Sequence, residues 1–271
     1  MPIRLTHFFV LLATFVFSLS VQAKDKRLNI TGSSTVAPLI LEIAKRYEKE
    51  NKGVRIDVQT GGSSRGILDA RRGLADIGMV SRAQKSNEGD LKFHAVAKDG
   101  IAIIVHADNP IESLSDEQVV DIYQNKIDNW SKVGGPDKKI TVINKAEGRS
   151  TLEVFLKYFN LKNSTIKADI VIGDNQQGIK TVVGNVNSIG YVSIGAAEFE
   201  EGHGAKIKRL SVAGIPATTE AVESGSFPIS RQLNLVTLGE LSQLADDFIK
   251  FAQSPEVLDL IEGQFLVPAK K

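Results

Sequence analysis

The sequence of 271 residues predicts an α/β protein built of open sheets covered by helices. Short apolar strands alternate with amphipathic helices along most of the chain, which is the pattern of such a protein. Several of these strands end in turns rich in glycine and hydroxyl residues. No cysteine is present, so no disulfide framework holds the fold, and the chain is long enough to form a sizeable core divided between two domains.

In the N-terminal part, the spacing of hydrophobic residues predicts which segments are helices and which are strands. Apolar residues at positions 36, 40, 43, 44 and 47 follow a helical period, and residues 54–60 alternate between apolar and polar as a half-buried strand does. A short apolar run precedes the first helix, and a second helix and a third strand follow. We therefore expect strands at 28–30, 54–60 and 76–80, and helices that start near 36 and 64.

In the rest of the chain, the pattern predicts a buried strand at 101–105 that stops at a turn-like break, 106–110. Ser115 is a candidate N-cap for a helix that ends at 123, and Ser150 with Glu153 has the spacing of a capping box. The remaining expected elements are strands at 140–144, 189–192 and 233–237 and helices at 150–159, 240–252 and 255–262.

The two ends of the chain and the break near residue 106 suggest how the domains are divided. Residues 1–23 combine a positive flank at Arg4, an apolar run and small residues before Ala23, as a cleavable export signal does. The apolar run is short for a membrane span, although a membrane anchor is the alternative. We expect a signal peptide at 1–23, a first domain at 24–105 and 230–271, and a second domain at 106–229.

The charge balance limits the classes of partner. The chain has 33 Lys and Arg residues against 32 Asp and Glu residues, a net charge of +1. A balanced chain gives no support for binding to nucleic acid or to a membrane surface. Any electrostatic attraction must therefore be local.

Three turns, which we call the hydroxyl turns, each precede a predicted helix. They occupy residues 32–35, 61–64 and 148–151 and contain glycine, serine and threonine. A helix N-terminus presents unpaired N–H groups and the positive end of the helix dipole, and nearby hydroxyls add donors. Two of these turns precede the break and one follows it. Each alone is an ordinary helix cap, but together they predict a cage for a small anion in a cleft between domains.

Other chemistries have weaker support. Residues 62–66 fit the G-x-S-x-G motif, so a secreted serine hydrolase that uses Ser64 is an alternative. It requires a late histidine, and only His203 lies late enough, in a charged and glycine-rich stretch. The scattered histidines and the absence of cysteine predict no metal site. Without a Walker or G-x-G-x-x-G motif, no nucleotide cofactor is expected.

The same stretches resemble the phosphate-binding proteins that serve bacterial phosphate ABC importers. The resemblance implies a two-domain periplasmic binding protein fold of type II, which closes on one phosphate in the cleft between its domains. It also implies that the protein passes phosphate to a membrane permease and catalyses no reaction. With the export signal, we expect a periplasmic protein that is a monomer. The matching stretches are 32–38, 60–66, 75–82, 146–151, 189–193 and 227–231.

Carried over position by position, the resemblance implies a set of phosphate-binding residues. Lys145 stands where the family has an arginine, and it keeps the charge but loses the bidentate fork. Arg149 brings a guanidinium to a position where the family has a serine, so it is a second candidate for the charge clamp. The implied residues are Ser34, Thr35, Val36, Ser63, Ser64, Ser81, Arg82, Lys145, Arg149, Ser150 and Thr151.

One departure from the family concerns selectivity. Many members have an aspartate where this chain has Ser81. In those members the aspartate accepts the proton of hydrogen phosphate and repels fully ionised sulfate. A serine hydroxyl is an acceptor without charge, so it does not repel sulfate. Another tetrahedral oxyanion, sulfate or molybdate, is therefore an alternative ligand.

Overall fold

The computed structural model describes residues 26–269, so the predicted signal peptide lies outside the described residues. The strands are β1 (Lys26–Gly32), β2 (Val54–Thr60), β3 (Ile77–Val80), β4 (Leu91–His106), β5 (Thr141–Lys145), β6 (Ile170–Ile172), β7 (Ser188–Ser193), β8 (Ile207–Leu210), β9 (Ser230–Leu238) and β10 (Val267–Pro268). The helices are α1 (Ala37–Glu50), α2 (Ser63–Arg71), α3 (Asp116–Tyr123), α4 (Ser150–Tyr158), α5 (Asn175–Val183), α6 (Ile194–Gly202), α7 (Thr219–Glu223), α8 (Gln243–Ala252) and α9 (Leu258–Glu262). Four short 3-10 helices join them at Ser86–Glu88, Trp130–Val133, Asn163–Thr165 and Pro255–Val257.

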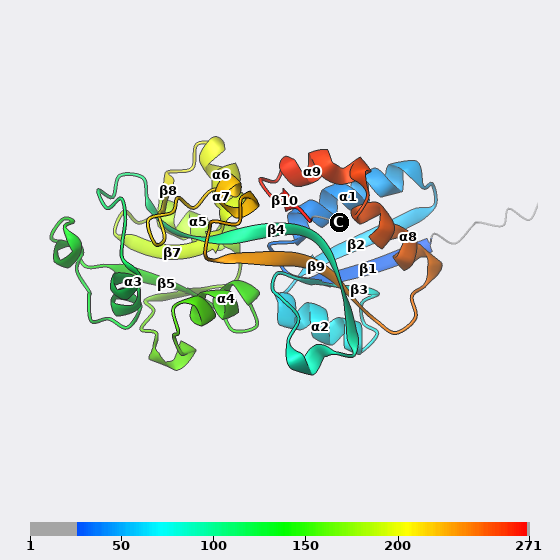
Figure 1. Cartoon of the computed structure of the whole chain (residues 1–271), viewed down its shortest axis with the longest axis horizontal. Coiled ribbons are helices and arrows are strands. Elements are labelled where there is room, and N and C mark those ends of the chain that lie inside the picture. The colour runs from blue at the N-terminus through cyan, green and yellow to red at the C-terminus, as the bar shows by residue number, and fades with distance from the viewer. Residues whose placement is uncertain (1–25, 270–271) are drawn as a thin grey trace, which may run out of the picture.

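The elements form two lobes side by side (Figure 1). Lobe 1 contains β1, β2 and β3 in parallel, together with β10 and the helices α1, α2, α8 and α9. In Figure 1, α1, α8 and α9 lie on one side of its sheet and α2 on the other. Lobe 2 contains β5 to β8 and the helices α3 to α7.

Each lobe has its own hydrophobic core. In lobe 1, α1 buries Ile40 and Ile43 against strand residues such as Leu28 and against Phe248 of α8. In lobe 2, the core includes the fully buried Trp130. Separate cores on either side of a cleft allow each lobe to move as a unit.

Two long antiparallel strands connect the lobes. Strand β4 pairs with β9 from Leu91 to Gly100. From Ile101 onward it pairs with β7 on one edge and, from Ile103, with β8 on the other. The chain therefore passes into lobe 2 along β4 and returns along β9 (Figure 1). The sheet partner changes between Gly100 and Ile101, which favours a crossover inside β4. The predicted division after residue 105 remains a prediction.

The structure corrects several of the expected elements. The strand expected at 101–105 is the second half of the 16-residue β4, whose first half contains charged residues that hide its apolar pattern. The N-cap predicted at Ser115 is confirmed, and Gln118 completes a capping box that was not predicted. The capping box predicted at Ser150 was wrong, because Arg149 takes the N-cap position and no side chain caps the helix. The carboxylate of Glu153 instead pairs with two cations of lobe 1.

Within residues 26–269, no helix has both the length and the apolar character needed to cross a membrane.

The first turn of α2 lies so close to the sheet that it requires glycine at position 66. A Cβ there would lie 2.8 Å from Thr31 O and 2.9 Å from Met79 O. We expect Gly66→Ala to lower the free energy of unfolding by about 1–3 kcal/mol, because backbone atoms must move apart. Urea unfolding of the mature protein measures this.

Gly89→Ala is the matched control. Its Cβ would meet no atom within 4 Å, and its φ of −66° suits any residue. We expect a change within about 0.5 kcal/mol. Equal stabilities of the two variants would contradict the close approach.

Candidate anion-binding site

The N-termini of three helices meet in the cleft between the lobes. Helices α1 and α2 come from lobe 1 and α4 from lobe 2, and all three begin at the hydroxyl turns. Only about 10 Å³ of space remains between the side chains, so the lobes are closed around it. This is about the space of one water molecule, so the lobes or the side chains between them must move apart to admit a five-atom anion. The cavity is lined by Ser33, Ser34, Thr35, Gly62, Ser63, Ser81, Lys145, Arg149, Ser150, Thr151 and Gly173.

Glycine allows the turns of the two lobes to touch. Gly62 has a φ of +95°, and a Cβ there would lie 2.7 Å from Gly148 O and 2.9 Å from Arg149 Cδ. The N–H of Ser64 donates to the same Gly148 carbonyl across the cleft, at 3.2 Å. The second and third hydroxyl turns are therefore in direct contact.

Hydrogen bonds fix the hydroxyls of lobe 1. Ser33 Oγ donates to Ser81 Oγ at 3.0 Å and accepts from the Thr35 N–H at 3.2 Å. Ser63 Oγ accepts from the Ser81 N–H at 3.2 Å. From lobe 2, Asn175 Nδ2 donates to Thr35 Oγ1 at 3.2 Å. The first and second hydroxyl turns and the end of β3 thus form one network.

The most informative atom of the site is Ser150 Oγ, in the first turn of α4. It is buried and has no hydrogen-bond partner among the described residues. An unsatisfied buried hydroxyl costs about 1–3 kcal/mol. It lies where the N–H groups and the dipole of a nine-residue helix favour an anion. This arrangement suits a ligand that accepts hydrogen bonds.

Two cations line the cavity, and their surroundings differ. Lys145 Nζ donates to Asp174 O at 2.8 Å and to Asn175 Oδ1 at 3.3 Å. Burial lowers the pKa of Lys145 from 10.5 to about 7; nearby Asp174 opposes this shift, and two arginines add to it. Arg149 is half-buried, and within residues 26–269 it has no carboxylate partner. Its charge is therefore available to an anion.

Three of the predicted residues lie outside the cavity lining. The Val36 side chain is fully buried in the core of lobe 1, although its backbone is at the N-cap of α1. Ser64 is exposed. Arg82 is buried in a bidentate pair with Glu88, at 2.7 and 2.8 Å, and its Nε lies 3.1 Å from Glu153 Oε2. The charge of Arg82 is thus already balanced.

Sequence reasoning missed three buried residues behind the cavity. Arg231 of β9 and Asp99 of β4 form an ion pair there, and Asn175 begins α5. The stretch 227–231 matches the family, but the resemblance assigns no role to its arginine. Neither position has a clear local signal, because β4 and β9 contain other polar residues, such as Lys98 beside Asp99 and Gln232 beside Arg231.

The contacts of the serine hydrolase residues do not form a triad. His203 Nδ1 is bonded to Phe199 O at 2.7 Å, and the His203 ring stacks on the Phe199 ring at the end of α6. Ser64 lies in lobe 1 and contacts the third hydroxyl turn. Neither residue has a hydrogen bond to the other. Within residues 26–269, no group of three or more histidines and acidic residues could hold a metal ion.

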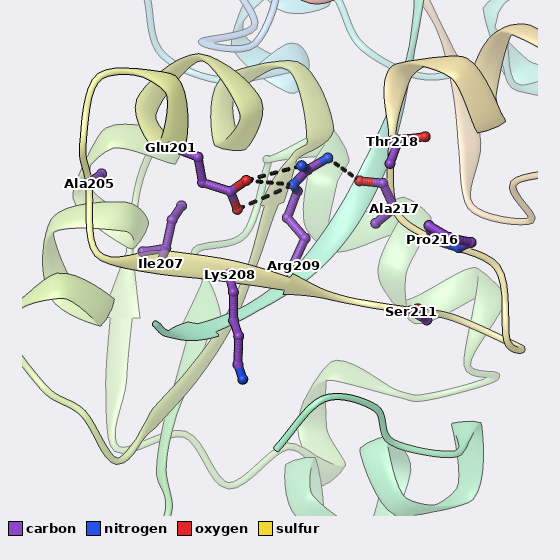
Figure 2. Close-up of a pocket in the computed structure, with 9 residues that line it drawn as sticks. All are labelled: Glu201, Ala205, Ile207, Lys208, Arg209, Ser211, Pro216, Ala217 and Thr218. Carbon is purple, nitrogen blue, oxygen red and sulfur yellow. Dashed lines mark hydrogen bonds and ion pairs between the residues drawn. The ribbon is translucent and has the colours of Figure 1, made fainter. Parts of the chain in front are cut away.

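A second hollow lies on lobe 2, around Arg209 (Figure 2). Figure 2 shows its guanidinium bonded to the Glu201 carboxylate and to the Ala217 carbonyl. Glu198 provides a second carboxylate. Lys208, the other cation that lines the hollow, pairs with Glu112, so within residues 26–269 both positive charges of the hollow already have carboxylate partners.

Comparison with known proteins gives the family. The model of the PBP superfamily domain matches residues 20–256. The phosphate-binding protein PstS of Bacillus subtilis is 30% identical over 247 residues, covering 89% of this chain and 80% of its own. That of Borreliella burgdorferi is 29% identical over 266 residues, with 94% and 95% covered. The chain belongs to the PBP superfamily and, within it, to the family of PstS phosphate-binding proteins.

Solved structures of similar proteins indicate the same family. A putative phosphate ABC transporter substrate-binding protein with bound phosphate, from Clostridium perfringens, is 32% identical with a TM-score of 0.84, covering 90% of this chain and all of its own. An ABC-type phosphate transport receptor from Vibrio cholerae is 27% identical with a TM-score of 0.73, covering 89% and 100%.

The family confirms the resemblance and the fold class. The chain has the two-domain type II fold of these proteins, with the ligand cleft between its domains. Members of the family are substrate-binding components of transporters and not enzymes, so the serine hydrolase alternative was wrong.

The depressed pKa of Lys145 predicts a particular pH dependence. The unfolded chain keeps the ordinary value of 10.5, so between pH 7 and 10.5 it binds more protons than the folded protein. The free energy of unfolding without phosphate should therefore rise across this range, by up to a few kcal/mol, relative to Lys145→Met. Urea unfolding across this pH range measures the difference.

Phosphate is the internal test of this prediction. A bound anion raises the pKa of Lys145. With saturating phosphate, the difference in the free energy of unfolding between the wild type and Lys145→Met should therefore depend less on pH. Lys126→Met, on the exposed surface, is the control and should follow the wild-type curve. Parallel curves for all three proteins would contradict the prediction.

Proposed function

We propose that this protein captures inorganic phosphate outside the cytoplasm and delivers it to a membrane ABC permease. The observation that carries the proposal is the buried Ser150 hydroxyl at the start of α4, which lies beside Arg149; among the described residues the hydroxyl has no hydrogen-bond partner and the arginine has no carboxylate partner. The names of its relatives and the phosphate bound in the Clostridium perfringens structure support phosphate as the ligand.

We infer that both lobes bind the anion at once. Ser34, Thr35 and Ser63 contribute hydroxyls from lobe 1, and Ser150 and Thr151 contribute them from lobe 2. Contacts from both sides select the closed arrangement of the lobes. For a ligand of five heavy atoms, an efficiency of about −1.5 kcal/mol per atom gives a dissociation constant in the micromolar range.

The proposal also covers the setting of the protein. Export through the signal at residues 1–23, with cleavage after about Ala23, fits the sequence pattern, and a location outside the cytoplasm fits the transport family. We also propose that the protein works as a periplasmic monomer. A permease that accepts phosphate is the membrane partner.

Sulfate and molybdate remain alternative ligands for one structural reason. In the described part of the chain, the cavity lining contains no carboxylate that would repel a fully ionised oxyanion. The selectivity for phosphate therefore depends on hydrogen bonds from neutral groups.

Titration calorimetry of the mature protein tests the ligand, and Ser150→Ala makes the test specific. We expect phosphate to bind at micromolar levels or tighter, and Ser150→Ala to bind it about 10- to 100-fold more weakly because one donor to the anion is lost. The same variant should be about 1 kcal/mol more stable without phosphate, since it removes an unsatisfied buried hydroxyl.

Sulfate and molybdate, titrated in the same way, show which oxyanion binds best. If phosphate gives no heat at micromolar levels, the proposed ligand is wrong. If Ser150→Ala destabilises the protein without phosphate, the hydroxyl has a structural partner instead.

The two cations should differ in importance. Lys145 already donates to Asp174 O and Asn175 Oδ1, whereas Arg149 has no carboxylate partner in the described part of the chain. We expect Arg149→Ala to weaken phosphate binding by about 10- to 100-fold and Lys145→Ala by less. Arg149→Lys should recover part of the loss, because it restores charge without the fork. Calorimetry that gives equal losses for the two alanine variants would contradict this assignment.

A further inference from the structure

A buried ion pair lies on the two strands that join the lobes. Arg231 of β9 and Asp99 of β4 are direct neighbours in the strand register. Arg231 Nε and Nη2 donate to Asp99 Oδ2 at 3.0 and 2.7 Å, and the exposed fractions of the two side chains are 1% and 0%. The pair is therefore removed from water at the crossover between the lobes.

The remaining donors of Arg231 point to the hydroxyls of the cavity. Nη1 donates to Thr151 Oγ1 of lobe 2 at 2.9 Å. Nη1 also lies 3.4 Å from Ser81 Oγ, and Nη2 lies 3.3 Å from Thr35 Oγ1, both in lobe 1. A guanidinium has five N–H groups, and these contacts with the two to Asp99 use all of them. Arg231 thus touches three cavity hydroxyls although it does not line the cavity.

These contacts set the direction of the hydrogen bonds. A hydroxyl oxygen has two acceptor positions and one proton. Thr35 Oγ1 accepts from both Arg231 and Asn175, and Ser81 Oγ accepts from both Arg231 and Ser33. With both acceptor positions used, each hydroxyl can act toward a ligand only as a donor.

Asp99 holds the arginine in place from the side of lobe 2. Its Oδ1 accepts from Ser193 Oγ at 3.0 Å and from the Gly195 N–H at 3.3 Å, where α6 begins. Thr35 and Thr151, on opposite lobes, can both reach Arg231 only when the lobes are closed. Closure of the lobes and orientation of the hydroxyls therefore occur together.

We propose that Arg231 is a positioning residue for anion binding, which turns the hydroxyls of Thr35 and Ser81 into donors toward the ligand and holds the hydroxyl of Thr151 beside them. The inference rests on the proposed function and adds to it. Ser81 in this arrangement cannot accept a proton from the ligand. The site instead offers its protons to a tetrahedral dianion, and Asp99 keeps the guanidinium from becoming the ligand's own partner.

A double-mutant cycle tests the positioning role. Arg231→Lys keeps the charge beside Asp99 but has three donors in place of five, so contacts to the hydroxyls are lost. We expect it to weaken phosphate binding by about 10- to 100-fold, measured by calorimetry on the mature protein. In a Thr151→Val background, the same substitution should cost at least about threefold less, because one of the hydroxyls that it orients is already gone.

Two further variants complete the design. Asp99→Asn leaves Arg231 present but removes the charge that holds it. Its loss of phosphate affinity should also be smaller in the Thr151→Val background. This variant provides the test if Arg231→Lys does not fold. Arg209→Lys alters a guanidinium with carboxylate partners in lobe 2, away from the cavity, and should change the affinity less than about twofold (Figure 2). Thermal unfolding without phosphate shows that each variant is folded.

The outcomes separate the two proposals. If wild-type protein binds no phosphate, the proposed function is wrong and the positioning role falls with it. If the wild type binds phosphate but Arg231→Lys binds within about threefold of it, or the losses in the cycle simply add, only the positioning role is wrong. The role of Arg231 is supported if its substitution costs less phosphate affinity in the Thr151→Val background and if Arg209→Lys leaves the affinity unchanged.

Discussion

The structure depends on bringing three helix N-termini to one point. Each carries a partial positive charge, and Lys145 and Arg149 add to the potential there. These positive charges repel one another unless negative groups lie close to them. The carbonyls of Asp174 and Gly148 compensate part of this charge from within the protein, whereas the carboxylate of Asp99 is already balanced by Arg231. The remaining positive potential is what an anion would neutralise, and it explains why both lobes contribute to one small cavity.

The sequence predicts those parts of the site that have a local signal. The hydroxyl turns stand at strand-to-helix junctions and are visible from their composition, and the structure brings Thr35, Ser63 and Thr151 to one cavity. Ser115 likewise caps its helix as local chemistry predicts. The alternation of strands and helices gave the fold class for the same reason, because hydrophobic spacing is a local property.

The parts that could not be predicted depend on tertiary pairing. Asp99 and Arg231 are far apart in sequence, and only the register of β4 against β9 makes them neighbours. Glu153 has the spacing of a capping residue, but an ion pair with Lys85 at 2.6 Å draws it across the cleft. Arg82 follows Ser81 directly, yet Glu88 occupies its guanidinium. In each case a partner that no local pattern reveals decides where the charge lies.

The contact between Gly62 and Gly148 has a mechanical consequence. The lobes meet there backbone against backbone, with no room for even one carbon atom between them. Any larger residue at position 62 would act as a wedge that stops the lobes short of full contact. The absence of a side chain at position 62 therefore lets the lobes close fully, and it slows the release of a bound anion together with the charges that surround it.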